Sequence, residues 1–567
     1  MDPQFDFLSF RKQQEAINEK TLAETGHKET AEAARVLSKK SSGRPKAPAD
    51  RKPAKKRKVD ALAAAYDGDS SSTAGDGPVR RSSRRQPTRA VNSQTEEERL
   101  EIEAKNAEET KLAREEERRL KHADRPVLAN EGGTNHALGQ EDLDAEFERL
   151  TMFDPSEHEA EMKRWKKGTK PPLGTKKLQT YAEDLELRSI VKIIPERIYS
   201  MAVHPGRTRD LVFAGDKSGH MALWDCTNAG QRKPPAAQKL KSPVGEDGDE
   251  AEDAAAEEEE RDHGRWWNWQ AHKGNSVSWL KFRPGQMDAI YSSGYDGTMR
   301  VTHFERGISE EVIDGDQLIG NDDALIHSFD FDPTGNELWA SDNDGGLIWR
   351  DLRQSMRHTK RWYIDRYKVG CVSINQANPD LAATAHLKRY MALWDLKALK
   401  GMSTDASTDD IINASQILHY DHEKACSSAY FDPTGTRLAT TSYDDSVRIW
   451  DIEPKNLNAL KKTNQKSGFE PVERIAHNCQ VGRYVTVLRA HWSTIPTLPP
   501  HLHVGSMDRS VDLISPDGTS VANLYDADHI TAVPAVTASH PTREKRHYGG
   551  SASGKVSFFT TPLEEEA

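Results

Sequence analysis

The sequence predicts an all-β fold, a seven-bladed β-propeller, which follows a long, mostly disordered and charged N-terminal arm. The first observation behind this prediction is an eight-residue frame, clearest as DDSVRIWD at residues 444–451. The frame occurs seven times, beginning at residues 218, 296, 344, 388, 444, 508 and 553. Its fourth position is always apolar and its sixth is always aliphatic or aromatic, which is the period of two that indicates a half-buried β-strand.

The second observation is the spacing of these copies. Successive copies begin 78, 48, 44, 56, 64 and 45 residues apart, and the shortest intervals match the ~40–45 residues of one blade in a WD-repeat propeller. A proline turn such as His204-Pro205 or Asp432-Pro433 ends a strand upstream of most copies. The Trp-Asp pair is intact at Trp224-Asp225, Trp394-Asp395 and Trp450-Asp451. Residues 186–562 therefore resemble a seven-bladed WD-repeat propeller.

One segment before the first frame is expected to close the ring. The stretch SIVKII at residues 189–194 aligns with SQILHY at 415–420, which precedes the inner strand of the fifth blade. No comparable stretch follows the seventh frame before the acidic tail at 563–567. Residues 189–194 are therefore predicted to form the outer strand of the last blade, which removes an exposed sheet edge.

Composition separates the arm from the propeller. Only 35% of the chain is hydrophobic, 30% is charged and the net charge is −11. Residues 1–185 are the part of the chain poorest in apolar residues, and they contain no repeat frame. We therefore expect them to be mostly disordered and to contribute nothing to the core. No apolar run approaches the ~18 residues of a membrane span, and no secretory leader is evident, so a soluble protein without a membrane partner is expected.

Three segments outside the repeats carry concentrated charge. The densest part of a basic stretch, Lys55, Lys56, Arg57 and Lys58, is typical of a nuclear localisation signal, with a merely solvated charge run as the alternative. Ser93 and Glu96 have capping-box spacing at the start of a predicted single helix. The acidic insertion at 234–263 is best interpreted as a solvated loop, although it could contact a basic partner such as a histone.

The chain shows no pattern of an enzyme. Phosphate-binding loops, the nucleophile turn G-x-S-x-G and the metal pair H-E-x-x-H are all missing from the sequence. The four cysteines lack C-x-x-C spacing, so neither a disulfide framework nor a zinc site is indicated. We therefore expect a non-catalytic binding platform with no cofactor, no metal and no small-molecule substrate.

Four cations recur at equivalent places, shortly before the inner strand of a blade. They are Arg197, Lys273, Lys368 and Lys424. Cations that converge on one rim of a propeller would focus a positive field on the phosphates of DNA, despite the negative net charge of the chain. The alternative is that each of them is an ordinary exposed loop residue.

The stretch HNCQVGRYVTVLRAHW at residues 477–492 departs from the other blades. Gly482 would allow a tight turn, Arg483 offers a contact to phosphate or base, and Tyr484 can stack on a base unless it packs into the blade. The stretch resembles the long hairpin in relatives of the small subunit of the UV-damaged-DNA-binding complex. Together with the basic arm and the start FDFLSFRKQQEAINEKTLAE, it makes the chain resemble the fungal DNA damage-binding WD-repeat proteins of the changed-mutation-rate family.

This resemblance implies a nuclear DNA-binding protein in DNA metabolism or the damage response. Its partner would be single- or double-stranded DNA, with damaged (UV-irradiated) or distorted DNA preferred. One alternative is a substrate receptor of a cullin-type ubiquitin ligase, because such receptors dock their adaptor through W-D-x-R. Here Asp351 and Arg353 fit that motif and Arg350 replaces the Trp. The other alternative is a histone- or chromatin-associated scaffold.

Overall fold

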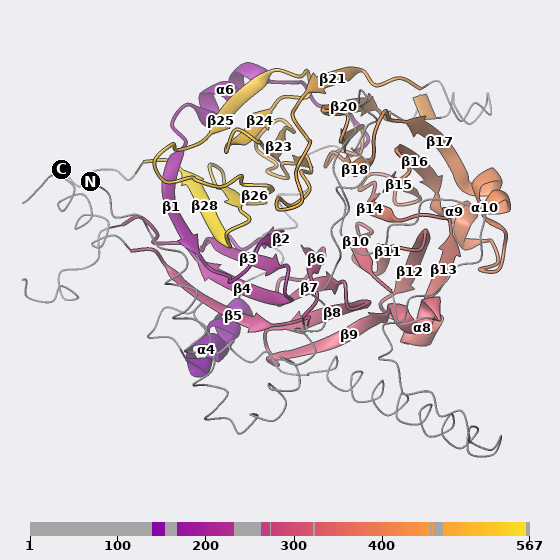
Figure 1. Ribbon diagram of the computed structural model, residues 1–567, viewed down its shortest axis with the longest axis horizontal. Helices are drawn as coiled ribbons and strands as arrows, with labels where there is room; N and C mark the ends of the chain where they lie inside the picture. Colours follow the sequence, from indigo (N-terminus) through magenta and orange to yellow (C-terminus); the bar gives the residue numbers. More distant parts are fainter. Residues whose placement is uncertain are drawn as a thin grey trace, which may run out of the picture. The chain divides into compact units, whose positions relative to one another are not determined.

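A computed structural model describes residues 139–152, 167–231, 262–272, 274–320, 324–453, 456–457 and 469–562. Within these residues the strands form seven four-stranded antiparallel sheets, which stand as blades around a common axis (Figure 1). The predicted seven-bladed propeller is confirmed. We number the blades in chain order of their innermost strands, and the strands of each blade are given from the axis outward.

The first four blades take their strands in chain order. Blade 1 consists of β2 (Ile198–Val203), β3 (Leu211–Asp216), β4 (His220–Asp225) and β5 (Arg265–Gln270). Blade 2 consists of β6 (Val277–Phe282), β7 (Ala289–Gly294), β8 (Thr298–His303) and β9 (Ile308–Asp314). Blade 3 consists of β10 (Ile326–Phe331), β11 (Glu337–Asp342), β12 (Gly346–Asp351) and β13 (Lys360–Tyr363). Blade 4 consists of β14 (Val369–Ile374), β15 (Leu381–His386), β16 (Tyr390–Asp395) and β17 (Gln416–Asp421).

The last blade departs from this order in its outer strand. Blade 5 consists of β18 (Cys426–Phe431), β19 (Arg437–Ser442), β20 (Ser446–Asp451) and β21 (Glu473–Ala476). Blade 6 consists of β22 (His491–Trp492), β23 (Leu502–Gly505), β24 (Val511–Ile514) and β25 (Ser520–Leu524). Blade 7 consists of β26 (Val536–Ser539), β27 (His547–Gly550), β28 (Lys555–Thr560) and β1 (Glu186–Lys192).

Each copy of the sequence frame is the turn into, and the body of, the third strand of a blade. In blade 5 the frame gives the turn at 443–445 and strand β20. Val447, Ile449 and Trp450 on this strand have no exposed surface. Ser446 and Arg448 on the same strand are buried too, so the third strand packs between neighbouring blades on both sides instead of being half-buried. The period of two marks the side that carries the aliphatic residues.

The ring closes as predicted, through strand β1. It pairs antiparallel with β28 from Glu186 opposite Thr560 to Lys192 opposite Lys555, so the two ends of the propeller lie side by side (Figure 1). The strand begins and ends earlier than residues 189–194. Ile193 and Ile194 leave the ladder and are buried in the core between blades 7 and 1.

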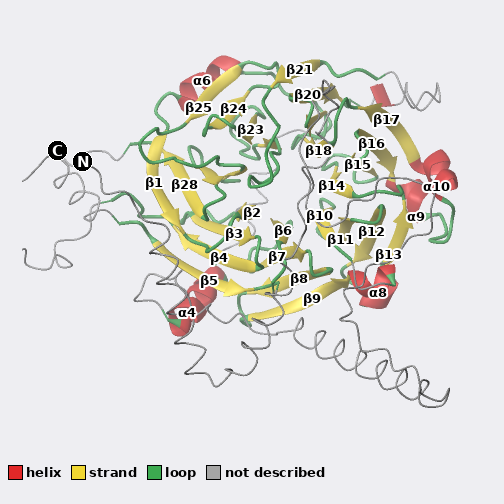
Figure 2. Cartoon of the chain, viewed as in Figure 1, coloured by secondary structure: helices red, strands yellow, loops and turns green. Residues whose placement is uncertain are grey.

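Short helices lie on the outside of the ring (Figure 2). Helix α8 (Gly315–Ile319) follows blade 2 and contacts its strand β8. Near blades 3 and 4 are α9 (Leu396–Lys400), α10 (Thr408–Ser415) and a 3-10 turn at Met356–His358. Two others precede the propeller, α4 (Gln140–Leu150) and α6 (Thr175–Ala182). None of the helices in the described ranges has the length and apolar character needed to cross a bilayer.

The expectation of disorder up to residue 185 is wrong for α4. Its apolar residues Leu143, Phe147 and Leu150 recur at helical spacing and are at most 1% exposed. They pack into the core between blades 1 and 2, where Phe147 meets the edge of Trp269 at a centroid distance of 5.7 Å. The polar composition of the arm as a whole concealed this short amphipathic segment.

Residues 167–185 are also ordered and contribute to the core, contrary to expectation. Gly168 donates its backbone N–H to the carbonyl oxygen of Thr434 at 2.8 Å, and Lys170 forms an ion pair with Asp451 at 2.5 Å. Further along, Leu178 and Tyr181 of α6 are buried against blades 6 and 7. The predicted helix from Ser93, the basic run at 55–58, residues 234–261 of the acidic insertion and the tail at 563–567 lie outside the described residues.

Candidate nucleic-acid interface

The antiparallel sheets give the propeller two distinct faces. In each blade the innermost strand begins at the end where the second strand turns into the third. We call the face that carries these strand starts and turns the rim face. Three of the predicted cations lie on the rim face, because they stand just before an innermost strand. Arg197 and Lys368 directly precede β2 and β14, and Lys424 lies two residues before β18. Asp351 ends a third strand and pairs with Glu337, so it lies on the opposite face together with Arg353.

Residues 477–490, which connect β21 to β22, do not form the long hairpin suggested by the resemblance. They contain no strand and only one turn, closed by a 3.3 Å hydrogen bond from the Val485 N–H to the Gly482 carbonyl. The reason is that this segment pairs with blade 1 instead of with itself. Arg197 Nη1 donates to the carbonyl oxygen of Arg483 at 2.8 Å, and Thr486 Oγ1 donates to that of Ile198 at 2.6 Å.

Because both sides of this turn are tied to blade 1, the side chain at its tip projects into solvent. Tyr484 is 79% exposed, which excludes the alternative that it packs into a blade. The glycine before the turn is not required by the backbone, since φ of Gly482 lies outside the left-handed region. A Cβ there would meet nothing within 4 Å. The chain therefore presents an accessible backbone, a cation and an exposed aromatic ring in succession at 482–484.

Two tyrosines that sequence reasoning missed connect the predicted cations. The Arg197 guanidinium lies 4.9 Å from the ring centroid of Tyr199, and its Nη2 donates to the Tyr199 hydroxyl at 2.7 Å. Tyr199 meets the edge of Tyr295 at 6.2 Å, and the Lys368 ammonium lies 6.0 Å from the Tyr295 ring. Arg197 and Lys368 therefore belong to one cluster. In the sequence, these tyrosines stand in the stretches RIY (197–199) and GYD (294–296). Each places one aromatic residue on the rim side of one of two neighbouring blades.

Two buried histidines near this cluster have lowered pKa values, because of their burial and in part because of the positive charges around them. His327 is 2% exposed, and its Nδ1 lies 3.1 Å from the Tyr295 hydroxyl. Burial is the main reason that its pKa lies well below the usual range, and the charges of Lys368 and Arg489 lower it further. Burial, Arg489 and Lys281 together lower the pKa of His491 to about 3. Both imidazoles are therefore neutral at physiological pH, and the net charge of the cluster comes from its lysines and arginines.

Aromatic rings from non-adjacent blades meet at the axis. Trp279 of β6 stacks on Tyr430 of β18 at 5.9 Å and on His491 of β22 at 5.7 Å. The Arg489 guanidinium lies 5.1 Å from the Trp279 ring. These strands belong to blades 2, 5 and 6. The ring contacts therefore cross the axis and join blade 2 to the two blades on the other side.

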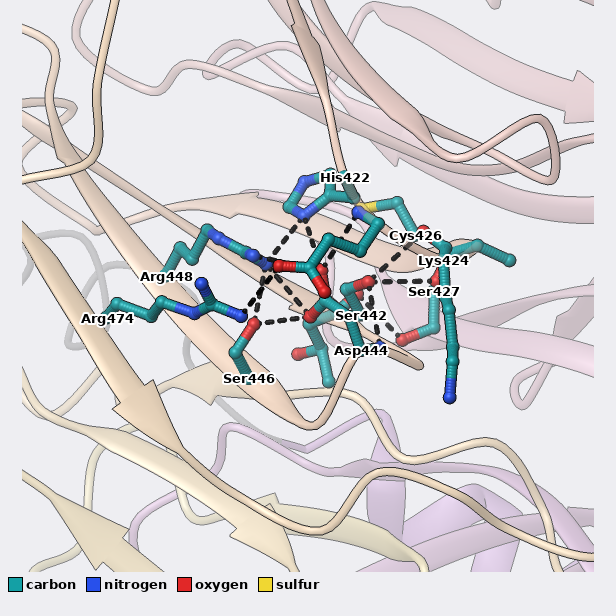
Figure 3. A network of polar contacts seen from close by, with 12 residues as sticks. His422, Lys424, Cys426, Ser427, Ser442, Asp444, Ser446, Arg448 and Arg474 are labelled. Atoms are coloured by element: carbon teal, nitrogen blue, oxygen red, sulfur yellow. Dashed lines mark hydrogen bonds and ion pairs between the residues drawn. The ribbon is translucent and has the colours of Figure 1, made fainter.

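Lys424 lies next to a different network, in blade 5 (Figure 3). Arg448 binds Asp444 at 2.9 Å and the Nδ1 of His422 at 2.8 Å. Burial and the charge of Arg448 lower the pKa of His422 to about 3. Only the backbone of Lys424 joins this network, by accepting a hydrogen bond from Ser442 Oγ at 3.2 Å, while its side chain extends away from it (Figure 3). Lys424 therefore shares the rim face with Arg197 and Lys368 without sharing their contacts.

The remaining predicted residues lie elsewhere. Lys273 falls outside the described residues. On the opposite face Arg353 binds Asp351 through two hydrogen bonds, of 2.9 Å from Nε and 2.8 Å from Nη2. This contact with Arg353 lowers the pKa of Asp351. Arg350, which stands where the docking motif has a tryptophan, is only 8% exposed.

Comparison with known proteins finds one matching family of repeats and several proteins that are similar over most of the chain. The family described as WD domain, G-beta repeat matches residues 415–451, which span β17 to β20. The DNA damage-binding protein CMR1 of Cryptococcus neoformans var. neoformans is 33% identical over 442 residues, covering 69% of this chain and 72% of the relative. The chain belongs to the CMR1 family.

Other members of the CMR1 family show similar agreement. The Mycosarcoma maydis protein is 30% identical over 481 residues, which cover 68% of this chain and 73% of the relative. The Aspergillus clavatus protein is 34% identical over 385 residues, which cover 65% of each chain. Both are named as DNA damage-binding proteins. The family resemblance drawn from the repeat frames and the Gly482–Tyr484 segment is thereby confirmed.

Proposed function

We propose that this CMR1-family protein is a nuclear, non-catalytic DNA-binding protein that prefers damaged or distorted DNA and acts in DNA metabolism or the damage response. The observation that carries the proposal is the position of Tyr484, which is 79% exposed at the tip of a turn that Arg197 and Thr486 fix to blade 1. The relatives named as DNA damage-binding proteins support the same function.

The cations of the rim face supply the affinity that does not depend on sequence. The Arg483 side chain is exposed beside Tyr484, and the half-buried Lys368 lies in the same cluster as Arg197. Each phosphate contact releases about one condensed counterion, so affinity falls steeply with salt. Arg197 has a different role, because its Nη1 and Nη2 donate to Arg483 and Tyr199. It positions the turn.

The preference for damage follows from the exposed ring. A tyrosine ring can stack on a base only where that base is unstacked from its neighbours. In intact duplex the protein must supply the unstacking free energy, whereas at a lesion part of that cost has already been met. The same turn therefore binds distorted DNA more tightly than intact DNA of equal charge.

A titration of the full chain against intact and UV-irradiated duplex of one sequence tests this function. We expect tighter binding to the irradiated duplex and a linear fall of log K with log salt on both. Equal affinity for the two duplexes would contradict the preference for damage, and binding that is insensitive to salt would contradict the phosphate contacts. Arg353→Ala, a cation removed from the opposite face, is the matched control and should leave both curves unchanged.

A further inference from the structure

Blade 4 is one of three blades that have no glycine at the left-handed position of the turn between the second and third strands. Four other blades have a glycine at the left-handed position of this turn, with φ between 73° and 88°: Gly219, Gly297, Gly345 and Gly554. In blades 4, 5 and 6 the position is held by Arg389, Asp445 and Arg509, with φ of 72°, 59° and 67°. A side chain in this region is disfavoured relative to glycine. The turn of blade 4 is thus made of Lys388 and Arg389, although an Asp-Gly or Ser-Gly pair, as in other blades, would adopt this backbone conformation at lower cost.

This turn lies beside an exposed aromatic residue on the rim face. The backbone N–H of Leu387 donates to the carbonyl oxygen of Lys368 at 3.2 Å, which holds the turn against the loop that enters β14. On that loop Tyr367 is 46% exposed, and the Lys388 ammonium lies 4.3 Å from its ring centroid. Arg366, which precedes Tyr367, and Arg389, which follows Lys388, are also exposed.

The positive charges of this surface are not neutralised by carboxylates. Among the described residues no ion pair joins an acidic side chain to Arg366, Lys388 or Arg389. The acids at this end of the blade have other partners. Asp365 binds His386 at 2.8 Å and Tyr390 at 2.6 Å, Asp421 binds His419 at 3.0 Å, and Glu423 binds Arg474 at 3.2 Å. The blade 4 surface therefore combines an aromatic ring with exposed, uncompensated cations.

We infer that the blade 4 surface, formed by Arg366, Tyr367, Lys388 and Arg389, binds an unpaired nucleic-acid strand. Tyr367 stacks on a base, and the three cations contact the phosphates that flank it. A ring set among cations is the arrangement by which proteins hold single strands without reading their sequence. Charge alone would also attract an acidic peptide, but a peptide gives no reason for the exposed ring. The inference rests on the proposed function, because Lys368 joins this surface to the Arg197 cluster.

Fluorescence anisotropy with a labelled oligothymidylate of about 12 nucleotides, within the usual site size of single-strand binders, tests the inference on the full chain. Arg389→Gly is the central variant, because it restores the residue that four other blades use. It should reduce the salt slope of binding by about 0.7 without lowering the melting temperature. Tyr367→Ala should weaken binding at least about fivefold with an unchanged slope. Lys397→Ala, an exposed cation on the opposite face of the same blade, should change nothing.

Several outcomes would overturn the inference. They are a Tyr367→Ala protein that binds the oligonucleotide like the parent, an Arg389→Gly protein with an unchanged slope, or a polyglutamate chain that competes as well as the oligonucleotide. An oligouridylate measured in parallel shows whether DNA or RNA is the preferred strand, and tight binding of either supports the surface. If irradiated duplex still binds in a Tyr484-dependent way while the blade 4 variants have no effect, this inference fails and the proposed function stands.

Discussion

Arg197 Nη1 lies 2.8 Å from the carbonyl oxygen of Arg483, although the two residues are separated by 286 positions in the chain. This hydrogen bond connects the first blade to the segment between blades 5 and 6. It leaves the Arg483 side chain exposed, and it makes the shape of the 482–485 turn depend on a residue that had been expected to bind phosphate itself.

Arg197 and Arg483 should therefore differ when each is replaced by alanine. Arg483→Ala removes one phosphate contact and should reduce the salt slope of duplex binding by about 0.9. Arg197→Ala frees the turn, so affinity should fall mainly because Tyr484 is no longer held in place. Its loss should be concentrated on irradiated DNA, with a smaller change in slope. Salt titrations of both variants decide the point, and identical behaviour of the two would contradict the positioning role of Arg197.

Helix α4 should contribute measurably to stability. Phe147 is 1% exposed and packs against Trp269 and Phe304, so Phe147→Ala should cost about 3–5 kcal/mol of unfolding free energy, as buried Phe truncations do. A chain shortened to residues 186–567 should be destabilised as well, since it lacks both α4 and α6. Denaturant unfolding gives the comparison. Met152→Ala, at an exposed position just after α4, is the control, and an unchanged midpoint for Phe147→Ala would show that α4 is dispensable.

Stability should fall as the pH drops below about 6.5, the usual pKa of histidine. Burial lowers the pKa of His501 to about 4, and burial with the nearby His501 lowers that of His547 to about 3. The folded protein keeps both rings neutral while the unfolded chain protonates them. The stability they confer is therefore complete above the unfolded pKa and decreases on acidification.

At pH 5 each of these histidines should account for about 2 kcal/mol of lost stability relative to pH 8. Unfolding titrations at several pH values measure the loss. His547→Gln should remove its share of the pH dependence, at some cost in stability at pH 8 because the His547 ring lies 3.0 Å from the Tyr181 hydroxyl. A variant with the full pH dependence of the parent would show that other groups are responsible.

The basic run should direct the protein to the nucleus. Replacing Lys55, Lys56, Arg57 and Lys58 with alanine is expected to redistribute a fluorescently tagged chain into the cytoplasm, because an import receptor reads a dense basic run. The chain has a further basic stretch, RRSSRRQPTR at residues 80–89, and a parallel variant there is the control. Unchanged nuclear accumulation after loss of residues 55–58 would place the signal elsewhere.

The sequence predicted the propeller well because each blade repeats the same local requirement. A third strand such as β20 needs buried side chains at Val447 and Ile449, and this alternation is visible without any knowledge of tertiary contacts. Closure by β1 was predictable for the same reason, through its likeness to another outer strand. Helix α4 was hidden because its three buried apolar residues lie within a long polar arm.

The site was only partly predictable, because its contacts join distant blades. Arg197 and Lys368 were found from their equivalent places before inner strands. The Tyr199–Tyr295 contact that joins them depends on how blades 1 and 2 pack, and the hydrogen bond to Arg483 depends on ring closure. Neither leaves a periodic signal in the sequence. Exposure of Tyr484 likewise follows from the tertiary ties of its turn.

The most direct test of the account is the affinity of Tyr484→Ala for irradiated and for intact duplex, compared with the parent and with Tyr484→Phe. The alanine variant should bind irradiated duplex about 5- to 150-fold more weakly, the equivalent of the 1–3 kcal/mol of one stacked base, with little change in salt slope. The loss on intact duplex should be smaller, and the phenylalanine variant should resemble the parent. The melting temperature should be unchanged, since the side chain is 79% exposed. A stable Tyr484→Ala protein that binds both duplexes as tightly as the parent would contradict the account.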